Sequence, residues 1–565
     1  MLFISLIFTI LALALPSVNK GLSPIILTRI TALFLLFSSV LSINTLYYNS
    51  ISSGIGIYNG FFHVTTVSQL IETFLLITGS IILIAWPLIK ININNNSKDK
   101  EDLSNEKINY GSEYSLIVLF TTLGSILLIS SADLITMYLS IELQSFGLYI
   151  LASLYRYSES ASSAGLKYFL LGGLSSCIIL LGAALIYTYT GLTNFEAIFS
   201  LLSISNTINL PLDNLDINNF SNNGIILGIT LIIIGFLFKI AAAPLHNWAP
   251  DVYNDSPTIV TIWLTIIPKI AILMFLLDLI TQSTSSIGYD QYYLNEVNNI
   301  TNTFIIDINN IQLKDIIKNL LLISSLLSLI IGSIVGLAQS KIKRLLAYST
   351  ISHIGFILLA LAINTEQSIE SFLFYILQYT ITNLNTFLIL IALGYIIHNN
   401  LDKFNTQNKG SEKDIVFISE IKGQFYSNPL ITLSLSICLF SMAGIPPLMG
   451  FFSKQFVLYS AIQNGYYFMS IIAIVVSVIS ASYYLKIIKT LHSENENKVI
   501  LNTNDHQGLN KINIEGTQKL ENTIIISNFH SFSIATLTLT ILFFVLKPSL
   551  ILNITQLLSL SIFNQ

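Results

Sequence analysis

The sequence predicts an all-α polytopic membrane protein of about 14 transmembrane helices. It further predicts two inverted five-helix repeats, spans 4–8 and 9–13, in which the seventh and twelfth spans are discontinuous. Three observations support this fold class. Of 565 residues 53% are hydrophobic and only 10% are charged, whereas soluble domains carry about 25% charged residues. Apolar stretches of about 20 residues recur along the chain, which is long enough to cross a bilayer as a helix. Prolines and lysines also recur inside these stretches at two matching places.

The fourteen spans follow from the apolar stretches. They are expected at 2–18, 24–46, 62–89, 113–130, 132–154, 162–190, 224–246, 257–281, 316–337, 345–363, 369–397, 429–448, 450–489 and 528–547. The stretch 450–489 is too long for one simple span. Its first part is interpreted as the second half of a broken twelfth helix, and the rest as the thirteenth.

The N-terminal unit, 1–112, is expected to hold three helices and a loop. The chain opens MLFISLIFTILALAL and continues hydrophobic, with no Arg-rich, Ser-rich presequence. We therefore expect a retained first span and not a signal peptide. The motif GIGIYNG at 54–60 is expected to be a turn in an outer loop and not a nucleotide fingerprint.

The remaining units follow from the polar stretches between spans. We expect a first antiporter-like repeat at 113–281, a polar loop at 282–315, and a second repeat at 316–490. Residues 491–565 are expected to hold a polar loop, the last span and a C-terminal segment, 549–563, along the membrane interface. The long segments 282–315, 399–427 and 491–527 are interpreted as solvated or partner-facing surface.

The basic residues set the orientation. If the first helix runs from outside to inside, nineteen of the 26 lysines and arginines fall in or beside inner loops. Three face the other side: Lys314, Lys318 and Lys547. Four lie within spans: Lys167, Lys239, Lys269 and Lys454. This asymmetry follows the positive-inside rule.

Two expected helix breaks carry a lysine each. The first is KIAAAPLHNWAP, 239–250, which begins at Lys239, and the second is AGIPPLMGFFSK, 443–454, which ends at Lys454. Discontinuous helices at matching places in two halves are typical of transport sites. The alternative is that each proline only kinks a packed helix.

An acidic residue is expected deep in the fifth span. Glu142 lies nine residues from Asp133, or roughly 13–14 Å along a helix, which is close to half the hydrocarbon thickness. We expect Asp133 to be a turn or cap residue near the outer end. A charge at mid-bilayer costs roughly 2.5–3.5 kcal/mol, so such residues usually face a bundle interior or water.

The candidate site residues for proton translocation are Glu142, Lys239, Lys269, His353, Lys454 and Lys167. Lys167 lies nearer the inner end of its helix, so anchoring at the interface is the alternative for it. For His353 the alternative is a satisfied core histidine. Burial lowers the pKa of a lysine and a nearby carboxylate raises it again, so a Glu–Lys pair can hold or release a proton.

Other chemistries lack support in the sequence. It has no Gly-rich phosphate loop, no paired-histidine haem site and no basic patch with interleaved aromatics for nucleic acid. Cys177 and Cys438 both fall in apolar runs, which implies neither a disulfide framework nor a metal site. Proton pumping therefore needs a driving force from outside this chain.

Five stretches resemble the antiporter-like membrane subunits of respiratory complex I. They are SADLITMYLSIELQSFGLYIL, GLKYFLLGG, FKIAAAPLHNWAPDVYNDSPTIVTIWLTIIPKI, KIKRLLAYSTISHIGFILLA and SMAGIPPLMGFFSKQF. These stretches lie in spans 4–12, and the resemblance therefore extends over about two thirds of the chain. The most specific is HNWAPDVYNDSP followed by PKIA. The resemblance implies that Glu142 pairs with Lys239, that Lys269 and His353 continue a central hydrophilic axis, and that Lys454 ends it.

The resemblance also implies partners and cofactors. It places no cofactor in this chain and assigns NADH, FMN, iron–sulfur clusters and ubiquinone to partner subunits. Expected partners are the other membrane-arm subunits, namely the neighbouring antiporter-like subunit 4, the small subunits 4L, 6 and 3, and accessory subunits. Lipids are expected at the surface. The location would be the mitochondrial inner membrane, with the lysine-rich loops in the matrix.

Two other functions stay open from the sequence. One is an Mrp-type cation/proton antiporter subunit, which would use the same buried charges. The other is a structural subunit that only couples its neighbours, in which the buried charges have no role.

Overall fold

The computed structural model describes residues 1–15, 24–47, 54–84, 110–155, 158–207, 215–285, 313–402, 414–493 and 527–563. Within these ranges ten helices are long and apolar enough to cross a membrane, and five shorter apolar helices accompany them. The all-α membrane fold is thus confirmed; the number of fourteen spans stays a prediction.

The described residues of the N-terminal part form three helices and one hairpin. Its elements are α1 (Leu2–Ala14), α3 (Pro24–Thr45), β1 (Ile55–Ile57), β2 (Phe62–Val64) and α4 (Thr66–Ile84). Tyr58 and Asn59 turn the hairpin with positive φ angles, as tight turns require. The expected turn at 54–60 is therefore present. The third span begins at Thr66 and not at 62 because the preceding residues form β2.

The next seven helices cover the first expected repeat. They are α6 (Tyr110–Ile129), α7 (Leu134–Ala152), α8 (Glu159–Thr190), α9 (Phe195–Thr207), α10 (Leu215–Lys239), α11 (Trp248–Asp255) and α12 (Thr258–Ser285). Asp133 caps α7 by accepting a hydrogen bond from the amide of Ile135 at 2.9 Å. Its expected role as a cap is confirmed. The sequence analysis missed α9, which lies between the sixth and seventh spans.

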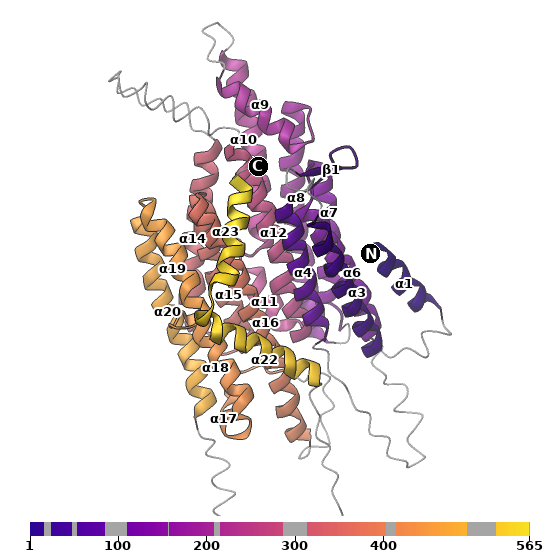
Figure 1. The fold of residues 1–565 in the computed structure, drawn as a ribbon, viewed down its shortest axis with the longest axis vertical. Coiled ribbons are helices and arrows are strands. Elements are labelled where there is room, and N and C mark those ends of the chain that lie inside the picture. Colours follow the sequence, from indigo (N-terminus) through magenta and orange to yellow (C-terminus); the bar gives the residue numbers. More distant parts are fainter. Residues whose placement is uncertain are drawn as a thin grey trace, which may run out of the picture.

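The remaining helices complete the bundle. They are α14 (Leu313–Leu337), α15 (Ile342–Ile363), α16 (Glu366–Asp402), η2 (Ile418–Ile421), α17 (Gln424–Ser427), α18 (Pro429–Ala443), α19 (Met449–Gln463), α20 (Tyr467–His492), α22 (Asn528–Phe543), η4 (Phe544–Leu546) and α23 (Ser549–Phe563). Figure 1 shows α22 running across the bundle and α23 running along it. The interfacial position expected for 549–563 stays a prediction.

Both expected helix breaks are present. α10 ends at Lys239 and α11 begins at Trp248, whose indole donates back to the carbonyl of Phe238 at 2.9 Å. α18 ends at Ala443, where Gly444 adopts a φ of 85°, and α19 begins at Met449. Glycine suits that left-handed position because it has no Cβ.

The same local hydrogen bonds occur once in each half of the chain. The amide of Leu134 donates to Thr193 and the amide of Phe195 donates to Ala132. In the second half the amide of Ile342 donates to Val416, and that of Ile418 donates to Ser340. Each pair of bonds ties the start of one helix to the segment that follows the next helix.

Matching close approaches accompany these bonds. Gly124 of α6 packs against Ser140 and Gln144 of α7, and Gly332 of α14 packs against Tyr348 and Ser352 of α15. The contacts between α6 and α7 therefore recur between α14 and α15, and the same number of residues separates each residue from its counterpart in the second half.

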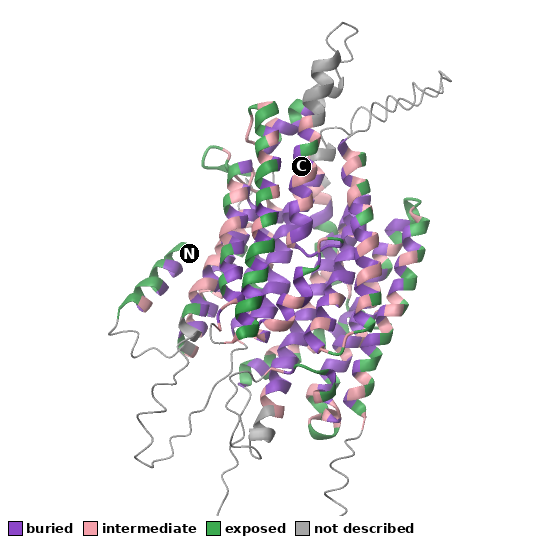
Figure 2. Cartoon of the chain, turned by 180° about the vertical axis from the view of Figure 1, so that it is seen from behind, coloured by how far each residue is buried: buried purple, intermediate pink, exposed green. Residues whose placement is uncertain are grey.

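Burial is greatest in the middle of the bundle. Figure 2 shows buried residues concentrated inside and exposed ones on the outer faces. Nearly all of α12 and α15 is buried, whereas α8 and α20 expose much of their apolar surface. Leu166, Phe169 and Val478 are examples of exposed apolar side chains. Such outer faces suit a lipid environment.

Candidate functional site

The first break brings an acid and an amine together. Lys239 Nζ lies 3.6 Å from Glu142 Oε1 and 3.3 Å from the hydroxyl of Ser145. Only 8% of the Lys239 side chain and 13% of the Glu142 side chain are exposed. The pairing implied by the resemblance is therefore present in the geometry. Because the two groups stand beyond ideal hydrogen-bond length, small movements of α7 or α10 change their coupling.

A small cavity lies beside this pair. Gln144, Ser145 and Lys239 line it together with Pro268 and Ile272 of α12. The amide nitrogen of Gln144 is buried without a hydrogen-bond partner, which favours a water molecule there. The residue after Pro268 is Lys269, so the helix that carries the next amine forms part of the cavity wall.

Lys269 lies at the centre of the bundle. It is 2% exposed, and its Nζ donates to Thr350 at 3.3 Å and to Tyr379 at 3.4 Å. The ammonium also lies 5.5 Å from the ring centre of Tyr253, within range of a cation–π contact. Within the described residues, no carboxylate lies within ion-pair distance of Lys269. Neutral oxygens and aromatic faces are its partners.

His353 continues the series on α15. Its Nδ1 lies 2.8 Å from the hydroxyl of Tyr375, and its Nε2 lies 3.3 Å from that of Tyr484. The ring of Tyr379 is 6.0 Å from the His353 ring. Tyr379 therefore contacts both Lys269 and His353. A histidine held between two hydroxyls can accept a proton on one nitrogen and donate from the other.

Lys454 lies beyond the second break. It donates to the carbonyls of Met442 and Ala443, both at 2.9 Å. These carbonyls belong to the last turn of α18, where a helix leaves its acceptors unpaired. Its ammonium is 5.7 Å from the ring of Phe356.

Lys167 does not join the other five residues. Its side chain is 52% exposed, and its Nζ lies 3.2 Å from Asp251. Asp251 also accepts from Arg344 at 2.9 Å. The neighbouring Tyr168 stacks on Trp248, with ring centres 4.6 Å apart. This exposed ion pair is consistent with the alternative of anchoring at the interface, and the role of Lys167 stays a prediction.

Sequence reasoning missed the tyrosines. Tyr375 and Tyr379 are spaced one helical turn apart on α16, so they share a face, and Tyr484 comes from α20. All three are buried. The two tyrosines of α16 are visible in the sequence as FLFYILQY within an apolar run. Tyrosine is common in membrane helices, so its presence there does not by itself indicate a functional site.

A profile described as NADH:quinone oxidoreductase/Mrp antiporter, transmembrane, matches residues 131–294 and 298–480. The NADH-ubiquinone oxidoreductase chain 2 of Rhizopus oryzae is 46% identical over all of this chain and all of its own.

Two solved structures share the fold. One is respiratory complex I from Thermus thermophilus with bound aureothin, with a TM-score of 0.65, 24% identity, and coverage of 98% of this chain and 99% of that chain. The other is an Mrp complex from a Dietzia species, with a TM-score of 0.68, 17% identity, and coverage of 100% and 96%. At these identities they support the fold alone.

Proposed function

The chain belongs to the NADH:quinone oxidoreductase/Mrp antiporter transmembrane family, and we propose that it is a proton-translocating core membrane subunit of respiratory complex I. In this proposal NADH-to-ubiquinone electron transfer takes place in other subunits. Its free energy drives protons along the buried groups of this chain.

One observation carries the proposal. Glu142 and Lys239 form a buried ion pair at the first helix break, and Lys269, His353 and Lys454 follow it through the interior. Burying four basic groups costs too much for packing alone to explain. We propose that Glu142, Lys239, Lys269, His353 and Lys454 transfer protons in steps through hydroxyls and water. Lys167 is the less certain sixth member.

The structure supports specific steps by geometry. When Glu142 is close, Lys239 holds its proton; when Glu142 moves away, burial favours release into the cavity beside Pro268. Tyr379 and Thr350 then connect Lys269 to the His353 region. Lys454 receives a proton at the carbonyl end of α18.

The domain boundaries belong to the same proposal. Two inverted units, 113–281 and 316–490, are supported by the matching bonds at Leu134 and Ile342. In this proposal the N-terminal segment 1–112 comes before the first unit, the polar loop 282–315 joins the two units, and the segment 491–565 follows the second.

Partners and location follow from the Rhizopus relative's name. We propose neighbouring membrane-arm subunits as partners, with NADH, FMN, iron–sulfur clusters and ubiquinone bound outside this chain. The membrane would be the mitochondrial inner membrane, with the lysine-rich loops in the matrix. The reaction class is a translocase, with no redox chemistry within this chain.

The test is the substitution Lys239→Met in the intact complex. We expect the proton-to-electron ratio to fall, because the amine that pairs with Glu142 at the break is removed. Lys167→Met is the matched control, and its proton-to-electron ratio should fall less than that of Lys239→Met. Both ratios are measured with proton-sensitive dyes in coupled vesicles during NADH oxidation. A full ratio in the Lys239 variant would favour the purely structural role.

A second candidate is an Mrp-type antiporter subunit, favoured by the shared fold of the Dietzia complex. Copurification separates the two. A complex I subunit travels with a flavin- and iron–sulfur-containing NADH dehydrogenase, and an Mrp-type subunit does not.

A further inference from the structure

Helix α11 contacts the surroundings of two buried amines. Its first residue, Trp248, donates to the carbonyl of Phe238, the residue before Lys239, at 2.9 Å. Near the other end of α11, the ring centre of Tyr253 lies 5.5 Å from the ammonium of Lys269. Both aromatic side chains are buried. Because they belong to one short helix, a displacement of α11 changes both contacts together.

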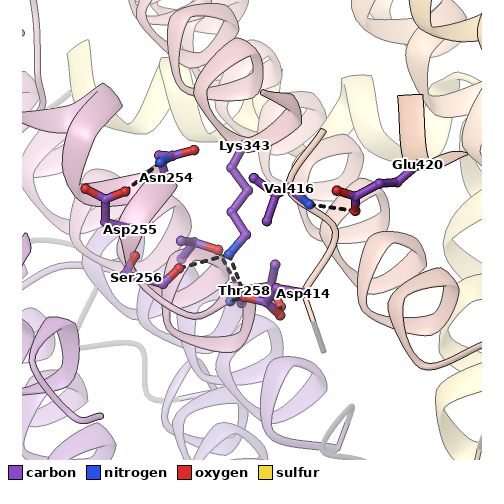
Figure 3. A network of polar contacts seen from close by, with 9 residues as sticks. Asn254, Asp255, Ser256, Thr258, Lys343, Asp414, Val416 and Glu420 are labelled. Carbon is purple, nitrogen blue, oxygen red and sulfur yellow. Dashed lines mark hydrogen bonds and ion pairs between the residues drawn. The ribbon is translucent and has the colours of Figure 1, made fainter. Parts of the chain in front are cut away.

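Two consecutive basic residues of α15 hold α11 from the second half of the chain. Arg344 Nη2 lies 2.9 Å from Asp251 Oδ1 in α11. Lys343 Nζ donates to the carbonyl of Ser256 at 3.0 Å (Figure 3). Ser256 caps the C-terminus of α11, and its amide donates to the carbonyl of Val252. An ammonium at this end of a helix interacts favourably with the helix dipole. The start of α15 therefore contacts both the middle and the end of α11.

A third basic residue reaches α11 from the first half of the chain. Lys167 of α8 lies 3.2 Å from the other oxygen of Asp251, so this carboxylate joins α8, α11 and α15. The side chains of Lys167, Asp251 and Arg344 are 52%, 33% and 39% exposed, and ion pairs as exposed as these contribute little to stability. Their distinct effect is geometric, since they set where α11 lies between the two halves.

Among the described residues, the second break lacks such contacts. Counted from the equivalent backbone bonds of the two halves, the counterparts of Lys343 and Arg344 are Ile135 and Thr136. Ile135 is exposed, and Thr136 donates to the carbonyl of Phe61. No ion pair of the described ranges involves α19. The basic pair is therefore not a requirement of the repeat and is specific to α11.

Helix α15 also carries partners of the proton-transfer groups. Its Thr350 accepts a hydrogen bond from Lys269 at 3.3 Å, and His353 lies further along the same helix. α15 thus contacts Lys269 directly through Thr350 and indirectly through α11. Chains of packed side chains and rigid helices of this kind carry coupling between separate sites.

We propose that Lys343 and Arg344 are positioning residues, which hold α11 so that the contacts of Lys239 and Lys269 respond together to a movement of α15. The proposal rests on the proposed function and adds a route by which the second half of the chain acts on the amine at the first break. Neither basic residue exchanges the translocated proton. Removal of their contacts frees α11 to shift, which separates Tyr253 from Lys269.

The test is the substitution Arg344→Met in the intact complex, because Lys343 also pairs with Asp414 and its loss would disturb a second contact. Arg344→Lys keeps a positive charge near Asp251. Lys341→Met is the matched control, since it removes a basic residue beside the start of the same helix, and within the described residues Lys341 makes no ion pair. Coupled turnover is measured as NADH oxidation with proton transfer in vesicles, per assembled complex counted by its flavin.

We expect coupled turnover per complex to fall roughly ten-fold in Arg344→Met, to recover substantially in Arg344→Lys, and to stay at the parent value in Lys341→Met. A high-resolution map of the Arg344→Met complex should show the Tyr253 ring displaced from Lys269. Parent-like turnover per complex in Arg344→Met overturns the proposal, and so does a Tyr253 ring that keeps its place, because either result means that the ion pair only stabilises the fold. Equal slowing in Lys341→Met also overturns it, since the loss of any basic charge there would then explain the effect.

If Arg344→Met does not assemble, Asp251→Asn removes the same ion pair from the side of α11 and is judged by the same two measurements. Lys269→Met separates failure of this proposal from failure of the proposed function. If Lys269→Met lowers the proton-to-electron ratio while the Arg344 and Asp251 variants match the parent, only the positioning role falls. If the Lys269 variant keeps the full ratio, the proposed function falls and the positioning role falls with it.

Discussion

The two broken helices pair their lysines with different partners. Lys239 is the last residue of α10 and faces the carboxylate of Glu142. Lys454 is the sixth residue of α19 and faces the carbonyls that end α18. A helix C-terminus carries about half a negative charge, so it stabilises an ammonium less than a carboxylate does. The partner of the lysine is thus a side-chain carboxylate at the first site and a backbone dipole at the second.

The coupling at the first site is open to a double-mutant cycle. Glu142→Gln removes the charge that holds the proton on Lys239, and Lys239→Met removes the amine. If the pair acts as a unit, the double variant loses no more of the proton-to-electron ratio than either single variant. The ratio is measured in coupled vesicles for all four forms. Additive losses would show that the two residues act separately.

Asp414 gives a pH-dependent prediction outside the spans. Burial would raise the pKa of this carboxyl, but the Lys343 ammonium and the Thr258 hydrogen bonds outweigh burial and hold the pKa below its usual range. Because the folded pKa is depressed, the ionised form stabilises the fold above the unfolded pKa of about 3.9, and this stabilisation is lost as the pH falls through the folded value.

Asp414→Asn should therefore lower the thermal stability of the complex at pH 7, by about 1–3 kcal/mol at this contact. The difference from the parent should begin to narrow below pH 4, where the unfolded parent takes up a proton at Asp414, and should narrow further as the pH approaches the lower folded pKa. Thermal denaturation of the solubilised complex between pH 7 and pH 3.5 measures both. A difference that stays constant over this range would contradict the assigned ionisation.

At the scale of elements, apolar length and proline placement were informative. Lengths of about 20 residues predicted the long helices, and Pro244 and the pair Pro446 and Pro447 predicted the breaks. α9 was not predicted from the sequence because this helix is short and mixed in polarity. Asn383 and Asp414 were not predicted for another reason. An unpaired buried amide and a partly buried loop carboxylate are defined by neighbours distant in sequence, which no local sequence pattern reveals.

The matched glycines predict where side chains are excluded. A Cβ at Gly332 would lie 2.6 Å from the amide nitrogen of Ser352 and 2.9 Å from the carbonyl oxygen of Tyr348, both backbone atoms that cannot yield locally. Gly332→Ala should therefore destabilise the α14–α15 pair by about 1–3 kcal/mol. Native gels and thermal denaturation of the complex measure assembly and stability.

Gly173→Ala is the control for that change. Nothing lies within 4 Å of a Cβ at Gly173 in α8, and alanine favours helix by about 1 kcal/mol over glycine. This variant should be neutral or slightly more stable. An equal loss of stability in both variants would show that the loss comes from replacing a glycine as such and not from close packing at Gly332.

At the scale of the whole molecule, the proposed inverted repeat would give the two halves access to opposite sides of the membrane. The bond from Leu134 to Thr193 and the bond from Ile342 to Val416 are equivalent. In the proposed orientation the first lies on the outer side and the second on the lysine-rich side. Such an arrangement lets one unit open outward while the other opens inward around a shared centre.

Labelling at equivalent positions tests that topology. Glu196 is the second residue of α9 and Ser419 the second of η2, and both are exposed. In a chain with Cys177→Ser and Cys438→Ser, we introduce Glu196→Cys or Ser419→Cys and add a membrane-impermeant maleimide. With the outer face of the inner membrane accessible, Glu196→Cys should react and Ser419→Cys should not; in inside-out vesicles the reactivity should reverse, because the equivalent sites lie on opposite sides. Reaction of both from one side would mean that the repeat is not inverted, and the lysine-rich loops would then no longer share one face of the membrane.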